Sequence, residues 1–184
     1  MMQDIAMYIL DLANNSLYAN ARNINICLIV DRQVDRLQLS ISDDGQGMED
    51  FIVEHATDPF YTTRKTRKIG LGLAFFKALA DQCDGEFTLK SKKGVGTTVM
   101  IDIRNSHIDT PPIGDLSSTL ITLIQADDLV DYRFTYRYDH QEFEFDTRKI
   151  KSMLDDVKIN ELNILLWIKE FLSERINELQ EGKR

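Results

Sequence analysis

The stretch from residue 3 to residue 21 places apolar residues at the spacing of an α-helix, and it constrains the fold more than any other segment. One face of this helix holds six apolar residues: Ile5, Ala6, Ile9, Leu10, Ala13 and Leu17. The opposite face holds Asp11, Asn14, Asn15 and Tyr18. A helix with one apolar face must cover another apolar surface, and the segments that follow are typical of a sheet.

Two pairs of short β-rich segments supply that sheet. Residues 25–30 and 37–43 are joined by DRQVDR, and residues 86–91 and 97–104 are joined by KKGVG, so we expect two hairpins. Between them, residues 71–82 form a second amphipathic helix. Hairpins whose one face can be covered by helices predict an α+β fold, a two-layer α/β sandwich with an antiparallel or mixed sheet.

The charge changes after residue 104. Residues 1–104 contain 12 basic and 14 acidic side chains, whereas residues 105–184 contain 10 and 16. Pro111 and Pro112 follow this change, and proline restricts itself and its predecessor to extended conformations. We therefore predict an N-terminal domain over residues 1–104 and a small α+β C-terminal extension over residues 105–184. The extension is expected to consist of a helix, a hairpin and a helical tail.

The last helix of this extension, expected over residues 160–179, carries an apolar row that resembles a dimer seam: Leu165, Ile168, Leu172 and Leu179. Arg175 interrupts the row, and the row is shorter than the repeats of a coiled coil. The pattern therefore favours packing against the protein's own body, with a homodimer as the alternative.

Composition excludes several classes of protein. With 22 Lys and Arg against 30 Asp and Glu, the net charge is −8, which disfavours nucleic-acid binding because phosphates need a basic surface. No unbroken apolar run approaches the roughly 20 residues of a transmembrane helix, so no membrane partner is expected. The N-terminal residues include no basic leader, and we expect a cytoplasmic location.

Two segments carry side chains suited to a flat ring and a cation. Asp43-Asp44-Gly45-Gln46-Gly47-Met48 ends a strand, where a carboxylate can accept a hydrogen bond from an amine and glycines let backbone approach a ring. Asp11 and Asn15 lie four residues apart on one helix face. Asn offers a neutral oxygen to a hard cation, and Asp can deprotonate a nucleophile. Each segment alone is more often an acidic turn or a solvated helix face.

Two further segments are suited to phosphate. Residues 62–73 contain four cations, Arg64, Lys65, Arg67 and Lys68, and then glycines that open a helix. The free N–H groups and the dipole at a helix N-terminus bind anions, so this basic loop suits a polyphosphate. A charge run alone is more often a solvated loop, and GVGTT at residues 94–98 is by itself a hairpin turn.

Other known sites are disfavoured. The chain has no GxxxxGK[ST], and neither GLGLAF nor GVGTTV completes GxGxxG after a strand. His55, His107 and His140 are scattered and form no metal cluster or triad pattern. Cys27 and Cys83 lack CxxC spacing and are expected to be small buried side chains.

Four segments, taken in order, resemble the ATP-binding domain of the GHKL superfamily, whose nucleotide site is called the Bergerat fold. They are DLANNSLYANA, DDGQGM, DPFYTT and GLGLA…GVGTTV. This superfamily includes gyrase, heat-shock chaperones, histidine kinases and mismatch-repair ATPases. The segment DPFYTTRKTRKIGLGLAFFKALAD is most similar to histidine kinases and anti-sigma-factor kinases. HID…P.GD, at residues 107–115, also resembles a segment of stand-alone ATP-binding proteins of anaerobic bacteria.

The resemblance implies ATP and Mg²⁺ as cofactors and a role for each matching residue. Asn15 matches the magnesium-binding asparagine, Asp43 the aspartate that binds adenine, and Phe60 the aromatic residue of the phenylalanine box. Thr97 or Thr98 is expected to reach the adenine pocket, and Thr98 matches a threonine that supports the adenine contact through water. The remaining implied nucleotide contacts are Gly45, Gly47, Thr63, Arg64, Lys65, Arg67, Lys68, Gly70, Leu71 and Gly72.

This sequence departs from the family pattern at three places. Asp11, the catalytic candidate, stands where related proteins carry glutamate or asparagine, so its carboxylate is one methylene shorter than that of glutamate. Tyr18 replaces a charged residue. The lid between Thr63 and Gly70 is short, which puts the burden of binding the triphosphate on its four cations.

The order of the motifs implies a function. Histidine kinases carry a phospho-accepting histidine on a dimerisation helix before the ATPase domain, whereas here the first motif begins within the first dozen residues. The resemblance therefore implies a Mg·ATP-binding regulatory protein that phosphorylates an unidentified partner protein or hydrolyses ATP slowly. The alternative is a non-catalytic interaction switch that binds ATP to order its lid.

Overall fold

The computed structural model describes residues 2–58 and 71–182, which fold around a six-stranded sheet of order β3-β4-β2-β1-β5-β6. Neighbouring strands run antiparallel except β1 and β5, which are parallel. The strands are β1 (Asn23–Asp31), β2 (Arg36–Asp43), β3 (Glu86–Lys92), β4 (Gly96–Arg104), β5 (Asp131–Tyr138) and β6 (Gln141–Asp146). The sheet is thus mixed, and both predicted hairpins form.

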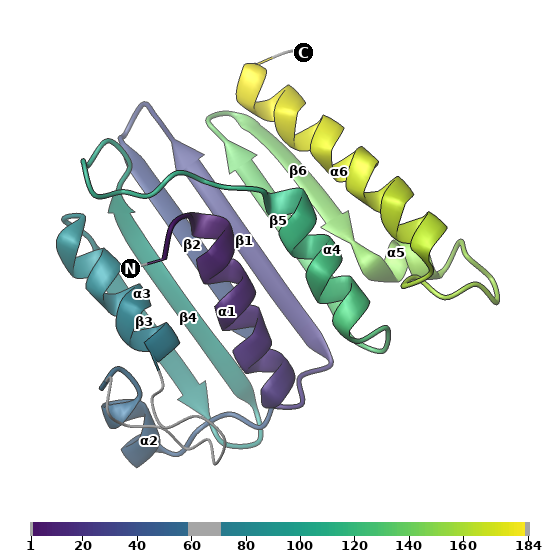
Figure 1. Cartoon of the computed structure of the whole chain (residues 1–184). Helices are drawn as coiled ribbons and strands as arrows, with labels where there is room; N and C mark the ends of the chain where they lie inside the picture. Colours follow the sequence, from purple (N-terminus) through teal and green to yellow (C-terminus); the bar gives the residue numbers. More distant parts are fainter. Residues whose placement is uncertain (1, 59–70, 183–184) are drawn as a thin grey trace.

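Helices cover one face of this sheet (Figure 1). They are α1 (Ile5–Tyr18), α2 (Asp50–His55), α3 (Leu71–Gln82), α4 (Leu116–Ala126), α5 (Thr147–Lys151) and α6 (Leu162–Glu181). Of these, α3, α1, α4 and α6 form the layer that packs on the strands, so the predicted two-layer α+β sandwich is confirmed. The short α2 lies beside β3. No helix in the described part of the chain has the length and hydropathy to cross a membrane.

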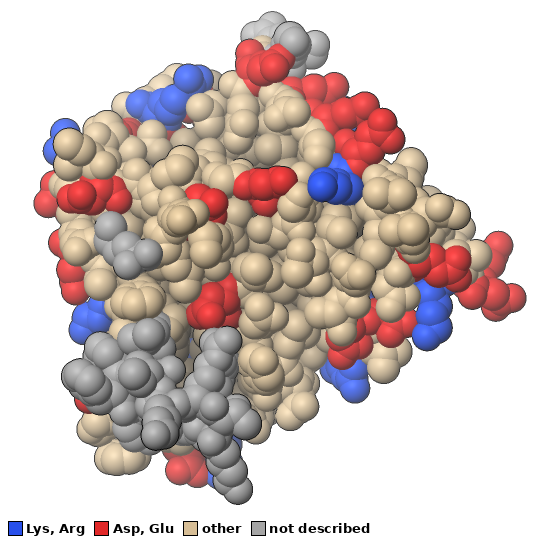
Figure 2. Space-filling view, in the orientation of Figure 1, with Lys and Arg blue, Asp and Glu red and all other residues tan. Residues whose placement is uncertain are grey.

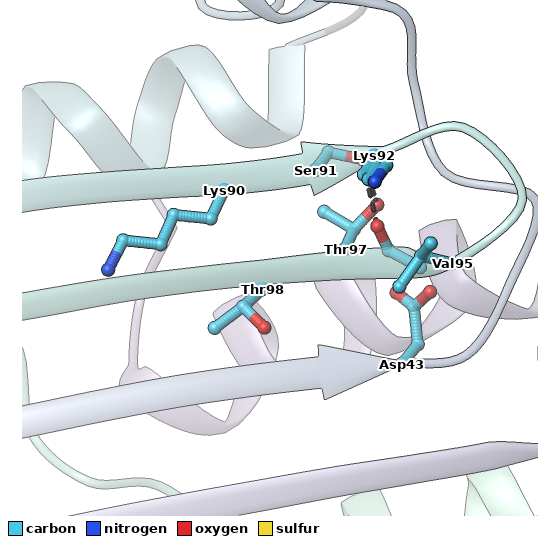
Figure 3. Close-up of a pocket in the computed structure, with 8 residues that line it drawn as sticks. Asp43, Lys90, Ser91, Lys92, Val95, Thr97 and Thr98 are labelled. Atoms are coloured by element: carbon cyan, nitrogen blue, oxygen red, sulfur yellow. Dashed lines mark hydrogen bonds between the residues drawn. The ribbon is translucent and has the colours of Figure 1, made fainter.

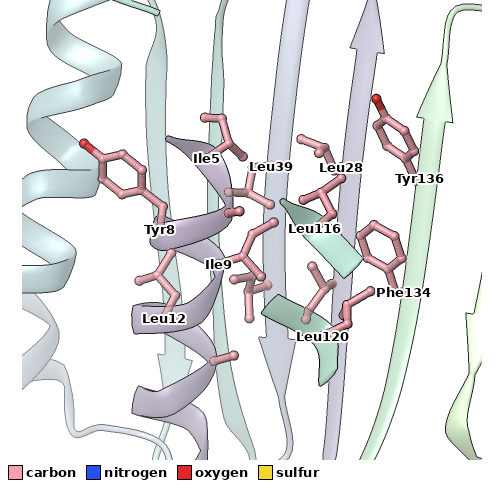
Figure 4. Packing of buried hydrophobic residues seen from close by; sticks show 14 of the residues in the cluster. Ile5, Tyr8, Ile9, Leu12, Leu28, Leu39, Leu116, Leu120, Phe134 and Tyr136 are labelled. Atoms are coloured by element: carbon pink, nitrogen blue, oxygen red, sulfur yellow. The ribbon is translucent and has the colours of Figure 1, made fainter. Parts of the chain in front are cut away.

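The core lies between the two layers because β1, β2 and β5 bury alternate residues. In β1 the side chains of Ile24, Ile26, Leu28 and Val30 are at most 2% exposed. They belong to one cluster with apolar residues of α1 and α4, and Figure 4 shows Ile9, Leu28 and Leu116 in it. Burying one such side chain contributes about 1.5–3 kcal/mol, so this interface dominates the stability of the sandwich.

The C-terminal part of the chain continues the same sheet. Strand β5 pairs with β1 along its whole length, from Asn23 opposite Asp131 to Val30 opposite Tyr138. Helix α4 packs between α1 and α6 and supplies the crossover that a strand parallel to β1 requires. The predicted boundary after residue 104 therefore falls between strands of one continuous sheet.

The proline-containing joint is packed against the start of α1. Ile5 N donates to Pro112 O at 2.9 Å and Ala6 N donates to Ile113 O at 2.9 Å. These bonds satisfy N–H groups of the first helical turn, which have no partner within the helix. Gly114 has a φ of +79°, and a Cβ there would lie 2.5 Å from Asp4 Cγ. The joint therefore fixes where α1 begins.

The apolar row of α6 packs inside the protein. Leu165, Ile168, Leu172 and Leu179 are each at most 8% exposed, and the helix packs on α4, β5 and β6. The interpretation that this row covers the protein's own body is confirmed. A homodimer remains a prediction.

We predict a pH-dependent contribution from the N-cap of α4. Ser118 donates to Asp115 through its hydroxyl at 2.6 Å and its N–H at 2.9 Å, and these bonds lower the pKa of Asp115 to about 2. Because the folded pKa lies below the ordinary value of 3.8, this stabilisation is present above about pH 4 and is lost as the pH falls towards 2. Asp115→Ala should lower the free energy of unfolding by about 1 kcal/mol at neutral pH.

Urea unfolding of both proteins at several pH values would test this. The difference between them should shrink as the pH falls from about 4 to about 2. A difference that stays constant over that range would contradict the assignment of the cap.

Candidate functional site

The polar face of α1 lies against the beginning of α3. A Cβ atom added to Gly72 would lie 2.0 Å from Asp11 Oδ2 and 3.4 Å from Asn15 Nδ2. The Asp11 carboxylate occupies the place where a side chain would begin, so only glycine lets the first turn of α3 approach both polar residues of α1 this closely. The structure thus brings together Asp11, Asn15 and Gly72, which the sequence analysis took from two separate motifs.

Asp43 is held at the end of β2 by two hydrogen bonds. Ser16 Oγ donates to Asp43 Oδ2 at 2.6 Å, and Gly45 N donates to Asp43 Oδ1 at 2.9 Å. Ser16 is 3% exposed and follows Asn15 directly on α1. The carboxylate of Asp43 is therefore fixed to the same helix that presents Asn15.

The neighbouring carboxylate, Asp44, anchors the chain between α1 and β1. Its Oδ1 accepts from Arg22 N at 2.7 Å and Asn23 N at 2.8 Å, and its Oδ2 accepts from Asn23 Nδ2 at 2.7 Å. Burial opposes ionisation of Asp44, but these hydrogen bonds outweigh it and hold its pKa below the ordinary value. Asp44 thus holds the loop between α1 and β1, whereas the adjacent Asp43 faces α1.

Glycines allow the loop after β2 to lie close to the β3–β4 turn. Gly47 has a φ of +61°, and a Cβ there would lie 2.0 Å from Lys92 O. Gly96 has a φ of +135°, and a Cβ there would lie 2.0 Å from Asp43 O. A Cβ on Gly45 would lie 2.8 Å from Ala19 O at the end of α1. Around Asp43, the main chain of the loop after β2 therefore packs directly on the main chain of the β3–β4 turn and of the end of α1.

Strand register decides which threonine shares a face with Asp43. Thr97 lies opposite Asp43 and Thr98 lies opposite Ser42. Alternate residues point to opposite faces, so Thr97 faces the helix layer with Asp43, and Thr98 points to the other face of the sheet. Ser91 Oγ lies 2.8 Å from Thr97 Oγ1, which joins β3 to the same group.

A hollow of about 280 Å³ lies at these strand ends (Figure 3). Its lining residues are Asp43, Lys90, Ser91, Lys92, Val95, Gly96, Thr97 and Thr98. Figure 3 shows Asp43, Ser91 and Thr97 gathered where the strands end, with Lys90 and Thr98 farther along β3 and β4. Thr98 lines this hollow, but its side chain points to the opposite face of the sheet from that of Asp43. Its contact with adenine stays a prediction.

Several implied contacts lie outside the described residues: Phe60, Thr63, Arg64, Lys65, Arg67, Lys68 and Gly70. Leu71 is the first residue of α3. Within residues 2–58 and 71–182, no group of three or more His, Cys, Asp and Glu side chains is arranged to hold a metal ion.

Sequence reasoning missed Ser16 and left open whether Thr97 or Thr98 lies with Asp43. The signal for Ser16 was present, because it lies four residues after Leu12 and three after Ala13, on the buried face of α1. A buried hydroxyl needs a hydrogen-bond partner, and Asp43 supplies it. The signal for Thr97 depended on the pairing register, which the sequence alone did not fix.

Residues 3–107 match the protein family described as histidine kinase-, DNA gyrase B- and HSP90-like ATPase. The chain belongs to this family. The ATPase resemblance of the four motifs is thereby confirmed.

Relatives of this ATPase domain include sensor kinases. The chain is 27% identical over 95 residues to the sensor histidine kinase YvrG of Bacillus subtilis, covering 50% of this chain and 16% of that protein. It is 38% identical over 72 residues to the autoinducer 2 sensor kinase/phosphatase LuxQ of Vibrio parahaemolyticus, covering 36% of this chain and 8% of that protein. The chain thus spans less than a fifth of the length of either relative.

A solved structure shares the fold. The N-terminal domain of a DNA repair protein superposes with a TM-score of 0.51 and 14% identity, covering 78% of this chain and 52% of that one. At this identity the likeness concerns the fold alone.

We predict that two glycines of the β3–β4 turn differ sharply in their tolerance of alanine. A Cβ on Gly94 meets nothing within 4 Å, so Gly94→Ala should cost about 1 kcal/mol through its positive φ. Gly96→Ala adds a clash with Asp43 O and should cost about 3 kcal/mol. Urea unfolding of the two variants gives both values, and equal losses would show that main chain does not pack tightly around Asp43.

Proposed function

We propose that this chain binds Mg·ATP between α1, the end of β2 and the start of α3, and acts as a regulatory protein. In this proposal it transfers the γ-phosphoryl group to a partner protein or hydrolyses ATP slowly. The observation that carries it is the link through α1: Ser16 holds Asp43, and the adjacent polar face lies at Gly72. Helix α1 thus holds Asp43, which can accept a hydrogen bond from a nucleobase, and also carries Asp11 and Asn15, which are suited to a magnesium-bound phosphate.

The chemistry of Asp43 favours adenine. Each of its carboxylate oxygens already accepts one hydrogen bond, from Ser16 or from Gly45, and retains a second acceptor site. An ionised carboxylate only accepts, so it matches the exocyclic amine of adenine and opposes the carbonyl oxygen that guanine carries at the same position. The family membership of residues 3–107 supports ATP as the nucleotide.

The residues around Gly72 fit a magnesium-bound phosphate. The Asp11 carboxylate and the Asn15 amide lie beside Gly72, next to the N–H groups of the first turn of α3. Those N–H groups can donate to phosphate oxygens, and the neutral Asn15 amide can bind a cation without adding negative charge. When bound, Mg²⁺ neutralises charge on the phosphates. In this proposal Asp11 accepts a proton from the attacking hydroxyl or water.

We predict that Asp43→Asn weakens ATP binding by about 10- to 100-fold, because a charge-assisted hydrogen bond is lost. An amide can both donate and accept, so the variant should also discriminate less between ATP and GTP. Isothermal titration calorimetry with each nucleotide and Mg²⁺ would measure both effects. Asp81→Asn, at an exposed position of α3, is the matched control and should bind as the wild type does.

Titration of the wild type with ATP tests the proposal directly. Absence of ATP binding at millimolar nucleotide would end the proposal. Equal binding by wild type and Asp43→Asn would remove Asp43 from the site while leaving ATP binding intact.

We predict that the variant Asp11→Asn distinguishes an ATP-hydrolysing or phosphate-transferring protein from a non-catalytic switch that only binds ATP. If Asp11 is the general base, turnover should fall by about 10²- to 10⁴-fold while ATP affinity changes little. Phosphate release and transfer of labelled phosphate to co-purifying protein, measured with and without Mg²⁺, would report this. Turnover within about twofold of the wild type would contradict the role of Asp11 as a base and would favour the ATP-gated switch.

A further inference from the structure

The outward side of α6 carries apolar side chains that the fold does not bury. Leu162, Leu166 and Trp167 are 70%, 57% and 50% exposed, and Phe171 is partly buried beside them. The opposite side of the helix already supplies the row that packs on α4, β5 and β6. A helix that covers its own core with one side and exposes apolar residues on another is typical of an interaction site. We call these four residues, together with the exposed Glu170, Glu174 and Glu178, the α6 surface.

The aromatic part of the α6 surface is held in place. The rings of Trp167 and Phe171 are stacked, with centroids 5.8 Å apart and planes at 11°. Phe171 also meets the edge strand β6 through Phe143, at 5.8 Å and 63°. Arg175 lies over the Phe171 ring at 5.8 Å and donates to Glu178 at 2.9 Å. A partner would therefore meet aromatic anchors that lose little conformational entropy on binding.

Carboxylates flank these anchors. Glu170, Glu174 and Glu178 are exposed on the same helix, and neither Glu170 nor Glu174 forms an ion pair with a described residue. Figure 2 shows acidic side chains gathered along the α6 edge of the molecule. Residues 105–184 hold 16 acidic and 10 basic side chains, so the surrounding field is also negative.

This charge selects the kind of partner. Nucleic acid and anionic membranes would be repelled by the carboxylates. A second copy of this chain in a two-fold contact would bring the same carboxylates against one another. A protein segment with apolar anchors and Lys or Arg beside them matches both the rings and the charges.

We propose that the α6 surface docks a cationic amphipathic helix of a partner protein. It lies at the edge of the sheet opposite α3 and α2, so docking leaves the candidate nucleotide site uncovered (Figure 1). The inference does not depend on ATP binding or phosphotransfer.

Trp167 is the single tryptophan of the chain and gives a direct readout. The probe is a helical Leu/Lys peptide without tryptophan, with Leu at i, i+3, i+4 and i+7, and the matched peptide carries Glu in place of Lys. The full chain without nucleotide is titrated with each peptide while Trp167 emission is recorded. The cationic peptide should shift the emission to shorter wavelength and saturate at one peptide per chain, and the acidic peptide should have no effect.

Charge reversal locates the site. Glu170→Lys/Glu174→Lys should weaken binding about tenfold or more, because close opposite charges are lost and repulsion replaces them. Asp81→Lys/Glu86→Lys, at exposed positions near the other edge of the sheet, makes the same change in net charge. This control should bind within about twofold of the wild type, since screening limits the reach of exposed charges to about 10 Å.

Three outcomes would overturn the proposal. Equal weakening by the two double variants would show only diffuse attraction to an acidic protein. Unchanged Trp167 emission would place the peptide elsewhere. A dimer of the wild type, seen by light scattering and broken by Leu166→Asp, would make this face a self-association surface. Circular dichroism of each variant would show that α6 remains folded.

Discussion

The hydrogen bond from Ser16 to Asp43 joins the helix layer to the sheet at the candidate nucleotide site. Its length of 2.6 Å and the 3% exposure of Ser16 place the donor out of water, where a missing partner would leave a buried polar group unsatisfied. Asn15 precedes Ser16 on α1, and Asp11 lies one helical turn earlier. The position of these polar residues relative to Asp43 therefore depends on how α1 is seated on the sheet.

Main-chain proximity completes the site. At Gly47 and Gly96 a Cβ would lie 2.0 Å from a carbonyl oxygen of a neighbouring segment, and at Gly72 it would lie 2.0 Å from the Asp11 carboxylate. These glycines let two loops and the start of α3 approach α1 and β2 more closely than side chains permit. The resemblance implies nucleotide contacts for Gly47 and Gly72 but not for Gly96, and the structure shows that all three permit close packing.

The continuous sheet separates two surfaces of the molecule. The candidate nucleotide site lies where β2, β3 and β4 meet α1 and α3, whereas α6 covers the β5–β6 edge (Figure 1). Because β5 pairs with β1 over eight residue pairs, the C-terminal part is a structural continuation of the ATPase domain. The α6 surface and the candidate nucleotide site therefore lie on one continuous sheet.

The sequence by itself determined the elements whose signals are local. The apolar spacing of α1, the hairpins and the amphipathic pattern of α3 predicted the layers, and the ordered motifs indicated the ATPase family. Asp11, Asn15 and Gly72 stand in motifs that can be read along the chain, and the structure brings the three residues together. The implied contacts between residues 60 and 70 remain predictions.

Only the tertiary structure decided which distant groups meet. Ser16 and Asp43 are 27 residues apart, and β1 pairs with a strand that begins at Asp131, so neither contact follows from a periodic pattern. Thr97 and Thr98 are adjacent in sequence, yet pairing with Asp43 and Ser42 sends them to opposite faces of the sheet. The physical reason is that strand register is set by long-range packing, and a shift of one residue would exchange every inward and outward side chain.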